Sequence, residues 1–437
     1  MSAPAVAVRD VTAWQRLHPL SPVVRTGRAF VPVVVVLLST LTTAQRREDI
    51  WWHLGPVALI AVAGVVSWLV TRWRVEGNDL RVESGLLRRE SQRIPLSRVQ
   101  AIDIVRPGIA RALGLAEVRV RTAGAGDSGR LAYLRVDEAE RVRARLLALA
   151  HGVAADAPTP PEWLLYGQRG DRLSVSVLLS RPVGVLAAFG VAVLVTRFLA
   201  PAAVGPLAST SLAYVVGVAT LVWRRFNGGW RLQVGEAADG LRLRFGALET
   251  TAETIPRGRV QAVVRSEPVA WRPMGWVRLQ LDVAGHARGR EERQSDTREL
   301  RTVVPAGARA EAELLLDRIL PSRPGALRPA PRRARWKSPL RYHWLGYDWN
   351  DAAVVVTSGR ITRRTTWVPL ARVQSLRLMQ GPVQRRLRLA SLHVDAAGKR
   401  VTAVARDRDV EEAEQLLAAL AEACRRAREP LRRDVTT

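Results

Sequence analysis

The residues best suited to binding chemistry are three arginines that recur in one short motif. Arg98, Arg259 and Arg372 each follow a proline by three positions and precede the dipeptide Val-Gln. A guanidinium group presents a planar fork of donors that fits phosphate or carboxylate, so these arginines could bind an anionic ligand. The motif also fits a structural role, in which the proline sets a turn and the Arg and Gln side chains satisfy backbone groups where a strand begins. We favour the structural role, because scaffold residues would recur in the same way.

A second group of arginines, Arg332, Arg333 and Arg335, lies in a proline-rich segment, 321–337, that contains no acidic residue. Such a composition predicts an extended, mobile linker. Beside an anionic bilayer, each basic residue near the surface gains about 1 kcal/mol. These three arginines are therefore candidates for binding lipid headgroups or a protein partner.

The net charge of +27, from 67 Lys and Arg against 40 Asp and Glu, raises nucleic acid as a rival partner. The arginines are spread along the chain, however, and no known nucleic-acid-binding module is present. We expect the partners to be the lipid bilayer, with anionic headgroups or unidentified membrane or cytoplasmic proteins, and no nucleic acid. The sequence does not indicate an oligomeric state.

Enzyme and metal signatures are missing from the sequence. The single cysteine, Cys424, excludes an internal disulfide, and the six histidines form no pair at ligand spacing. No GxSxG, HExxH or Walker A motif occurs. Residues 124–129 fit GxGxxG, but the residues after them alternate like a strand, whereas a dinucleotide site needs a helix there. We expect no catalytic residue, no cofactor and no metal.

Four apolar runs predict two transmembrane hairpins, 29–71 and 173–223. No charged residue occurs in the 22 positions from Ile50 to Thr71, a length that crosses a hydrocarbon core of about 30 Å. The run from Ala29 to Gln45 precedes it, and the runs Pro182–Thr196 and Phe198–Trp223 form the second pair. The alternative is that these runs are buried core helices of a soluble protein.

The arginines that flank the runs predict the orientation of the chain in the membrane. Arg25, Arg28, Arg72 and Arg224 border the predicted spans on one side, whereas the connectors on the other side carry no net positive charge. The positive-inside rule then places both termini and all large segments in the cytoplasm. We therefore expect a multi-pass protein of the cytoplasmic membrane.

One unit recurs three times along the chain. The motif Pro-x-x-Arg-Val-Gln is preceded by a glycine fifteen residues before the glutamine, and an Ala-Gly pair ends twenty-four residues after it. Fixed offsets of this kind indicate duplicated domains. The repeat-motif residues to which we assign a structural role are Gly85, Pro95, Gln100 and Gly124 in the first copy, Gly246, Pro256, Gln261 and Gly285 in the second, and Gly359, Pro369, Gln374 and Gly398 in the third.

Each unit shows several alternating segments followed by one amphipathic helix. Residues 80–83, 101–105 and 117–121 alternate apolar with polar residues, which predicts half-buried strands. In the third copy, Ala413, Leu416 and Leu420 share one helical face. The predicted organisation is an N-terminal segment 1–28, hairpin 29–71, domain 72–152, linker 153–172, hairpin 173–223, domain 224–320, linker 321–337, domain 338–427 and tail 428–437.

The pattern Gly … Ile-Pro-x-x-Arg-Val-Gln … Leu-Gly-Leu … Ala-Gly resembles the bacterial pleckstrin-homology-like (PH-like) domain, type 2. Three such units with two hairpins are similar to the YdbT-type membrane proteins, and the resemblance covers about residues 30–425. It implies three β-sandwich or barrel domains, each of two packed antiparallel sheets capped by a C-terminal helix, within a multi-domain membrane protein. In the third copy Arg388 replaces the glycine of Leu-Gly-Leu, so the resemblance does not extend to that turn.

The resulting functional hypothesis is a non-enzymatic membrane scaffold that presents three PH-like domains for binding protein or lipid headgroups. The resemblance implies a link to envelope stress or antimicrobial resistance and no catalytic activity. The alternative is a component of a membrane transport or export system with cytoplasmic regulatory domains. Polar residues that line the spans would favour that alternative, and the sequence offers Ser39, Thr40, Thr42 and Thr43.

Overall fold

The computed structural model describes two compact units of the chain. The first comprises Met1–Pro161, Leu248–Pro256 and Gly289–Glu291, and the second comprises Glu162–Ala247, Arg257–Arg288 and Glu292–Thr437. The residues that the structure describes are 14–21, 62, 65–66, 68–76, 79–84, 90–95, 99–106, 108–122, 129–151, 163–199, 204–237, 240–247, 250–256, 258–284, 300–320, 322–396 and 401–436.

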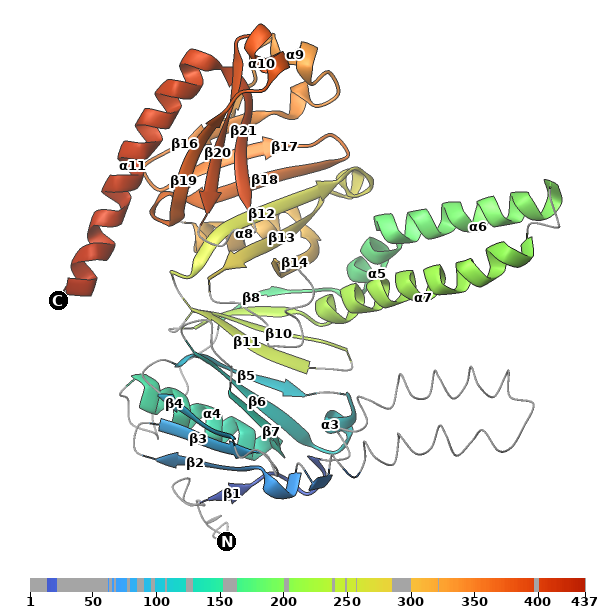
Figure 1. The fold of residues 1–437 in the computed structure, drawn as a ribbon, viewed down its shortest axis with the longest axis vertical. Helices are drawn as coiled ribbons and strands as arrows, with labels where there is room; N and C mark the ends of the chain where they lie inside the picture. The colour runs from blue at the N-terminus through green and yellow to red at the C-terminus, as the bar shows by residue number, and fades with distance from the viewer. Residues whose placement is uncertain are drawn as a thin grey trace. The chain divides into compact units, whose positions relative to one another are not determined.

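The described part of the first unit contains antiparallel sheets and the long helix α4 (Figure 1). One sheet has the strand order β1-β2-β3-β4, and in the other β7, β6, β5 and β11 are neighbours in that order. Its described strands are β1 (Gln15–Arg16), β2 (Arg72–Glu76), β3 (Asp79–Ser84), β4 (Glu90–Pro95), β5 (Val99–Arg106), β6 (Leu115–Thr122), β7 (Gly129–Arg135) and β11 (Thr250–Pro256), and its described helices include α3 (Gly108–Ala112) and α4 (Val136–His151).

Apolar residues at every second position of the strands form the core of the first unit. Trp73 and Val75 on β2, and Ile102 and Ile104 on β5, are two residues apart and are buried in one cluster. Residues two apart in a strand point to the same face, so each strand turns one apolar face inward. Leu146 of α4 closes this cluster. The strands and the closing helix predicted for the first copy are therefore confirmed.

The second copy of the repeat lies mainly in the second unit, together with a pair of long helices. Its strands β12, β13 and β14 are antiparallel neighbours, α8 follows β14, and β8, β9 and β10 form a second antiparallel set. The elements are β8 (Trp163–Gly167), α5 (Gly170–Leu178), α6 (Arg181–Leu199), α7 (Val204–Gly229), β9 (Gln233–Ala237), β10 (Gly240–Phe245), β12 (Val260–Pro268), β13 (Trp276–Val283), β14 (Arg301–Ala308) and α8 (Arg309–Ile319).

The third copy has two packed three-stranded sets and a C-terminal helix. Strands β16, β17 and β18 are neighbours, and β19, β20 and β21 form a separate sheet. Ala413 and Leu420 of α11 are buried, as the helical pattern predicted, and Leu420 belongs to the core cluster that residues of both sets form. The elements are β15 (Arg328–Pro329), α9 (Ala334–Lys337), β16 (Gly346–Trp349), β17 (Ala353–Ser358), β18 (Thr362–Pro369), β19 (Val373–Met379), α10 (Pro382–Arg386), β20 (Leu389–Ala396), β21 (Thr402–Asp409) and α11 (Val410–Thr436).

The same tight turn directly precedes β6, β13 and β20, the middle strands of the corresponding three-stranded sets, even where glycine is replaced. Gly114, Gly275 and Arg388 all have left-handed backbone conformations, with φ of 68°, 64° and 52°. Each donates its N–H to the carbonyl three residues earlier and accepts, at its own carbonyl, the N–H of the first residue of the closing helix. The turn is thus kept in the third copy, although Arg388 adopts there a conformation that L-residues disfavour.

The predicted hairpins are only partly described. Most of 29–71 lies outside the described residues, whereas the second region forms α5, α6 and α7. Among the described residues, no single helix combines the length and apolar composition needed to cross a bilayer. The pair Gly170–Leu178 and Arg181–Thr196, bent by 46° at its break, meets that criterion by length and composition.

The proline-rich segment differs from the mobile linker that its composition predicted. It contains the short strand β15 and the helix α9, and Ala334 is fully buried. Strand β15 pairs with β16, so part of the segment belongs to the sheet of the third copy. The cause is tertiary: Leu345, which directly precedes β16, and Leu389 of β20 pack with Ala330 and Ala334 in one buried cluster.

Candidate membrane-contact surfaces

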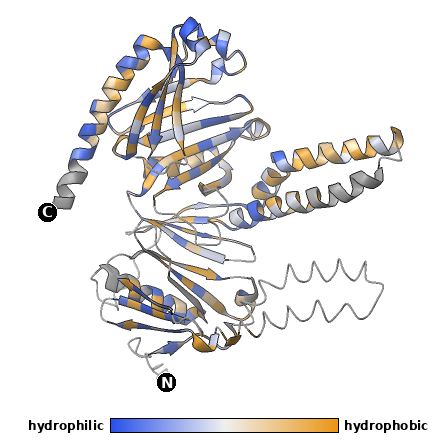
Figure 2. Ribbon diagram, in the orientation of Figure 1, coloured by the Kyte–Doolittle hydropathy of each residue, from blue (hydrophilic) through white to orange (hydrophobic). Residues whose placement is uncertain are grey.

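Helix α6 presents an unusually apolar surface. None of its side chains that the structure describes is buried, and Phe198 and Leu199 are each 80% exposed. Val185, Val191 and Leu194 are exposed as well, and no charged residue occurs between Arg181 and Arg197. Figure 2 shows this helix as a nearly continuous hydrophobic rod. An exposed patch of this kind marks a contact with a membrane or another protein.

The size of α6 fits a bilayer contact. Its 19 residues rise about 28 Å at 1.5 Å per residue, close to the thickness of a hydrocarbon core. Burying one such large aliphatic or aromatic side chain contributes about 1.5–3 kcal/mol. Helix α7 runs beside α6 as the second arm of a hairpin (Figure 1).

The base of this hairpin is fixed to the second copy of the repeat. Tyr166 donates a hydrogen bond to Gln168 Oε1 at 2.6 Å, and Gln168 Nε2 donates to the carbonyl of Ala306 on β14 at 3.1 Å. Burial raises the pKa of Tyr166 well above its ordinary value, so the phenol keeps the proton that it donates. Arg172 of α5 pairs with Glu311 of α8 at 2.9 Å. These bonds hold the helices in a defined orientation relative to the sheet.

A close approach at Gly229 tightens the same base. A Cβ atom at this position would lie 2.7 Å from Leu173 Cδ1 and 3.2 Å from the Pro305 ring, so no larger residue fits without rearrangement. Just before it, Phe226 stacks on Trp230 with ring centroids 4.8 Å apart. The last turn of α7 is thus packed against both α5 and β14.

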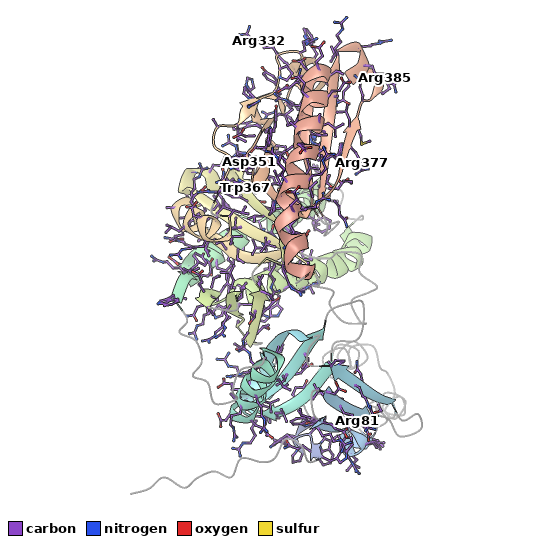
Figure 3. The ribbon with its side chains drawn as sticks, turned by 90° about the vertical axis from the view of Figure 1, so that its left-hand side faces the viewer. Arg81, Arg332, Asp351, Trp367, Arg377 and Arg385 are labelled. Carbon is purple, nitrogen blue, oxygen red and sulfur yellow. The ribbon has the colours of Figure 1, made fainter. Side chains whose placement is uncertain are left out.

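A second candidate surface is a cluster of exposed arginines around an exposed tryptophan on the third copy. Trp336 of α9 is 82% exposed and Leu340 is 66% exposed. The surface, which we call the basic end, comprises Arg332, Arg335, Trp336, Leu340, Arg385 and Arg386. Figures 1 and 3 place α9 and α10, with the labelled Arg332 and Arg385, at the same end of this copy. The sequence pattern indicated Arg332 and Arg335 but not Trp336, although this tryptophan stands directly between two basic residues.

One buried carboxylate holds the two halves of the basic end together. Asp407, 2% exposed on β21, accepts hydrogen bonds from Lys337 Nζ at 2.5 Å, Ser338 Oγ at 3.0 Å and Gln384 Nε2 at 2.7 Å. Lys337 and Ser338 end α9, and Gln384 lies in α10. Nothing in the sequence signalled this role, because the partners are about seventy and twenty residues away.

Not every predicted arginine remains available for a ligand. Arg333 forms an ion pair with Asp409, whereas Arg332 and Arg335 have no acidic partner among the residues that the structure describes. In the repeat motif, Arg98 lies outside the described residues. Arg372 donates to the carbonyl of Gly258, which joins the third motif to the second. Burial lowers the pKa of Arg259, and the positive charge of Arg372 lowers it further.

The repeat-motif residues are placed at strand ends. Gly246 and Gly359 have φ of 122° and 101°, which require glycine. Pro95, Pro256 and Pro369 end β4, β11 and β18. Gln261 and Gln374 lie at the start of β12 and β19, where Gln261 is buried with no hydrogen-bond partner for its Oε1 and Gln374 is exposed. Gln100 is the second residue of β5, and Gly85, Gly124, Gly285 and Gly398 lie outside the described residues.

Metal-ligand clusters and the single cysteine can be assessed in the described part of the chain. This part holds no cluster of three His, Cys, Asp or Glu side chains able to bind a metal ion. Cys424 is buried on α11, and burial raises the pKa of its thiol, which disfavours the reactive thiolate.

Repeated two-sheet units, each closed by a helix, define a protein built from PH-like domains. The family model described as "Bacterial PH domain" matches residues 21–150, 182–322 and 330–423. The chain therefore belongs to the bacterial PH domain family, type 2, as its motif predicted. It is also similar to the "UPF0699 transmembrane protein YdbT" of Bacillus subtilis (strain 168), with 20% identity over 314 residues. That match spans 62% of this chain and 63% of the relative, less than two thirds of its length.

Proposed function

We propose that this chain is a non-enzymatic, multi-pass protein of the cytoplasmic membrane that holds its PH-like domains at the inner surface. The observation that carries the proposal is the bent pair of α5 and α6, which has the length and composition of a span, together with the exposure of α6, none of whose described side chains is buried. The similarity to a protein named as transmembrane supports it. The hairpins 29–71 and 173–223 would anchor the chain, with both termini in the cytoplasm.

Anionic lipid headgroups are the ligand that the basic end fits best. Its four arginines, at about 1 kcal/mol each near an anionic surface, would together contribute about 4 kcal/mol, or roughly a thousandfold in affinity. Trp336 and Leu340 add side chains that favour the zone between headgroups and acyl chains. Anchoring by the hairpins keeps this surface at high local concentration beside the bilayer, so a weak contact is sufficient.

Membrane topology is tested by cysteine labelling of the full chain in cells. Cys424 is replaced by alanine, and single cysteines are introduced by Ala202→Cys, between α6 and α7, and by Arg332→Cys at the basic end. A membrane-impermeant maleimide should label A202C in intact cells and R332C only after permeabilisation. Labelling of R332C in intact cells would contradict the proposed orientation, and recovery of the chain in the soluble fraction would contradict the membrane assignment.

Lipid contact is tested with the full chain in nanodiscs. An environment-sensitive fluorophore attached through Trp336→Cys should shift its emission to the blue in nanodiscs that contain phosphatidylglycerol, relative to phosphatidylcholine alone. The double variant R332E/R335E should abolish the difference. The matched control is R425E/R426E, which changes the charge equally on exposed residues of α11. Equal effects of both pairs would show that net charge, and not the basic end, determines the contact.

A further inference from the structure

Adjacent copies of the repeat are joined by strand pairing, and the two junctions have the same register. Strand β5 of the first copy pairs antiparallel with β11 of the second, with Ile104 opposite Ala252. Strand β12 of the second copy pairs antiparallel with β18 of the third, with Arg265 opposite Thr365. Ile104 and Arg265 are each four residues after the motif glutamine, and Ala252 and Thr365 are each four residues before the motif proline. The junction is therefore a repeated interaction.

Strand β19 is the third copy's equivalent of β5 and β12, but it ends its sheet. Its described neighbour is β20 alone, in a sheet of order β19-β20-β21. The consequence appears in burial: Ser266 of β12 is 7% exposed, whereas Met379, at the same position of β19, is 49% exposed. Gln261 is buried and its equivalent Gln374 is exposed. An open strand edge presents backbone donors and acceptors that can pair with another strand.

The other strand type of the junction, the one that pairs with β5 and β12, also ends a described sheet in the first copy. Strand β4 corresponds to β11 and β18, since all three end at the motif proline. In its described sheet, of order β1-β2-β3-β4, it is the terminal strand. Among the described strands, β19 and β4 are thus the members of the two junction types that each end a sheet.

We propose that β19 of one molecule pairs antiparallel with β4 of a second copy of this chain, in the register of the internal junctions. That register places Met379 opposite Glu90 and Arg377 opposite Gln92. The same two strand types already pair twice within each chain, and the contact between molecules would continue that series. Because the two surfaces differ, the contact is head-to-tail and would join several copies into rows. The inference does not depend on lipid contact by the basic end.

Disulfide trapping between separately tagged chains tests this pairing. Both chains carry Cys424→Ala; one carries Met379→Cys and the other Glu90→Cys. Directly opposed residues of antiparallel strands have Cα atoms about 4.5–5.5 Å apart, within reach of a disulfide. Oxidation of isolated membranes that contain both chains should give a crosslinked heterodimer. Since each chain has one cysteine, a bond within one molecule cannot produce this band.

The control shifts one cysteine by a single residue. Ser91→Cys is next to Glu90 but points to the opposite face of the strand. The pair M379C with S91C should crosslink about tenfold less than M379C with E90C, because a disulfide tolerates little error in geometry. Equal yields, or no heterodimer with either pair, would overturn the proposal. Trapping of a different protein by M379C without the heterodimer would also overturn it, and would show that the edge binds another partner.

Discussion

The role assigned to Asp407 leads to a sharp prediction about the basic end. Replacement by alanine removes the acceptor for Lys337, Ser338 and Gln384. Hydrogen bonds to a charged group contribute about 1.5–3 kcal/mol each and are not additive. Alanine must also adopt the left-handed backbone of this position, where φ is 53°, at a cost of about 1 kcal/mol. Because Lys337 lies near the surface and regains water, we expect D407A to destabilise the contact by about 3–5 kcal/mol.

The measurement is hydrogen exchange of the full chain, read by mass spectrometry on peptides that cover 330–345 and 382–389. Loss of about 4 kcal/mol lowers protection roughly a thousandfold wherever this contact limits opening. The matched control is D407N, which keeps the side-chain size and tolerates the left-handed backbone, and which should lose less protection. Unchanged hydrogen exchange of both peptides in D407A would refute the role of Asp407 in joining α9 to α10. An equal increase in hydrogen exchange across all three copies would refute it as well.

Three further predictions concern the third copy. R388G should stabilise the chain by about 1 kcal/mol in thermal unfolding, because glycine relieves the left-handed strain; no gain would mean that the turn is unstrained. G359A should destabilise it by more than 2 kcal/mol or so, since its Cβ would lie 2.2 Å from the carbonyl oxygen of Thr362, and a wild-type melting temperature would contradict this geometry. Burial, and then the charge of Arg377, lowers the pKa of His393 below 6.5, so the unfolded chain binds the proton first. The contribution of neutral His393 to the free energy of unfolding should therefore be fully present above pH 6.5 and be lost as the pH falls below that value. The variant H393Q should lack this loss of stability in the same pH window.

The repeat units were predictable because side-chain patterns encode them. Alternating apolar residues specified β3, β5 and β6, and the spacing of Ala413, Leu416 and Leu420 specified the buried face of α11. The junctions between copies were not predictable, because they are made by backbone groups that every residue carries. Strands β12 and β19 share the Val-Gln start of the motif, yet one is covered and the other ends a sheet. Only the order of the copies along the chain determines which of them has a following neighbour.

The proline-rich segment shows why local charge overstates what a surface can bind. Its charged residues are all basic, which suggested that each arginine would be available to bind lipid headgroups. Carboxylates of the surrounding fold neutralise part of this charge: Asp409 and Asp407 of β21 pair with Arg333 and Lys337, and Glu313 and Asp317 of α8 pair with Arg323. These ion pairs order the segment and neutralise three of its basic side chains, so the arginines that remain available for lipid contact are those without an acidic partner among the described residues. A reversal at Arg333 should therefore loosen α9, whereas one at Arg335 should weaken lipid contact and leave the fold intact.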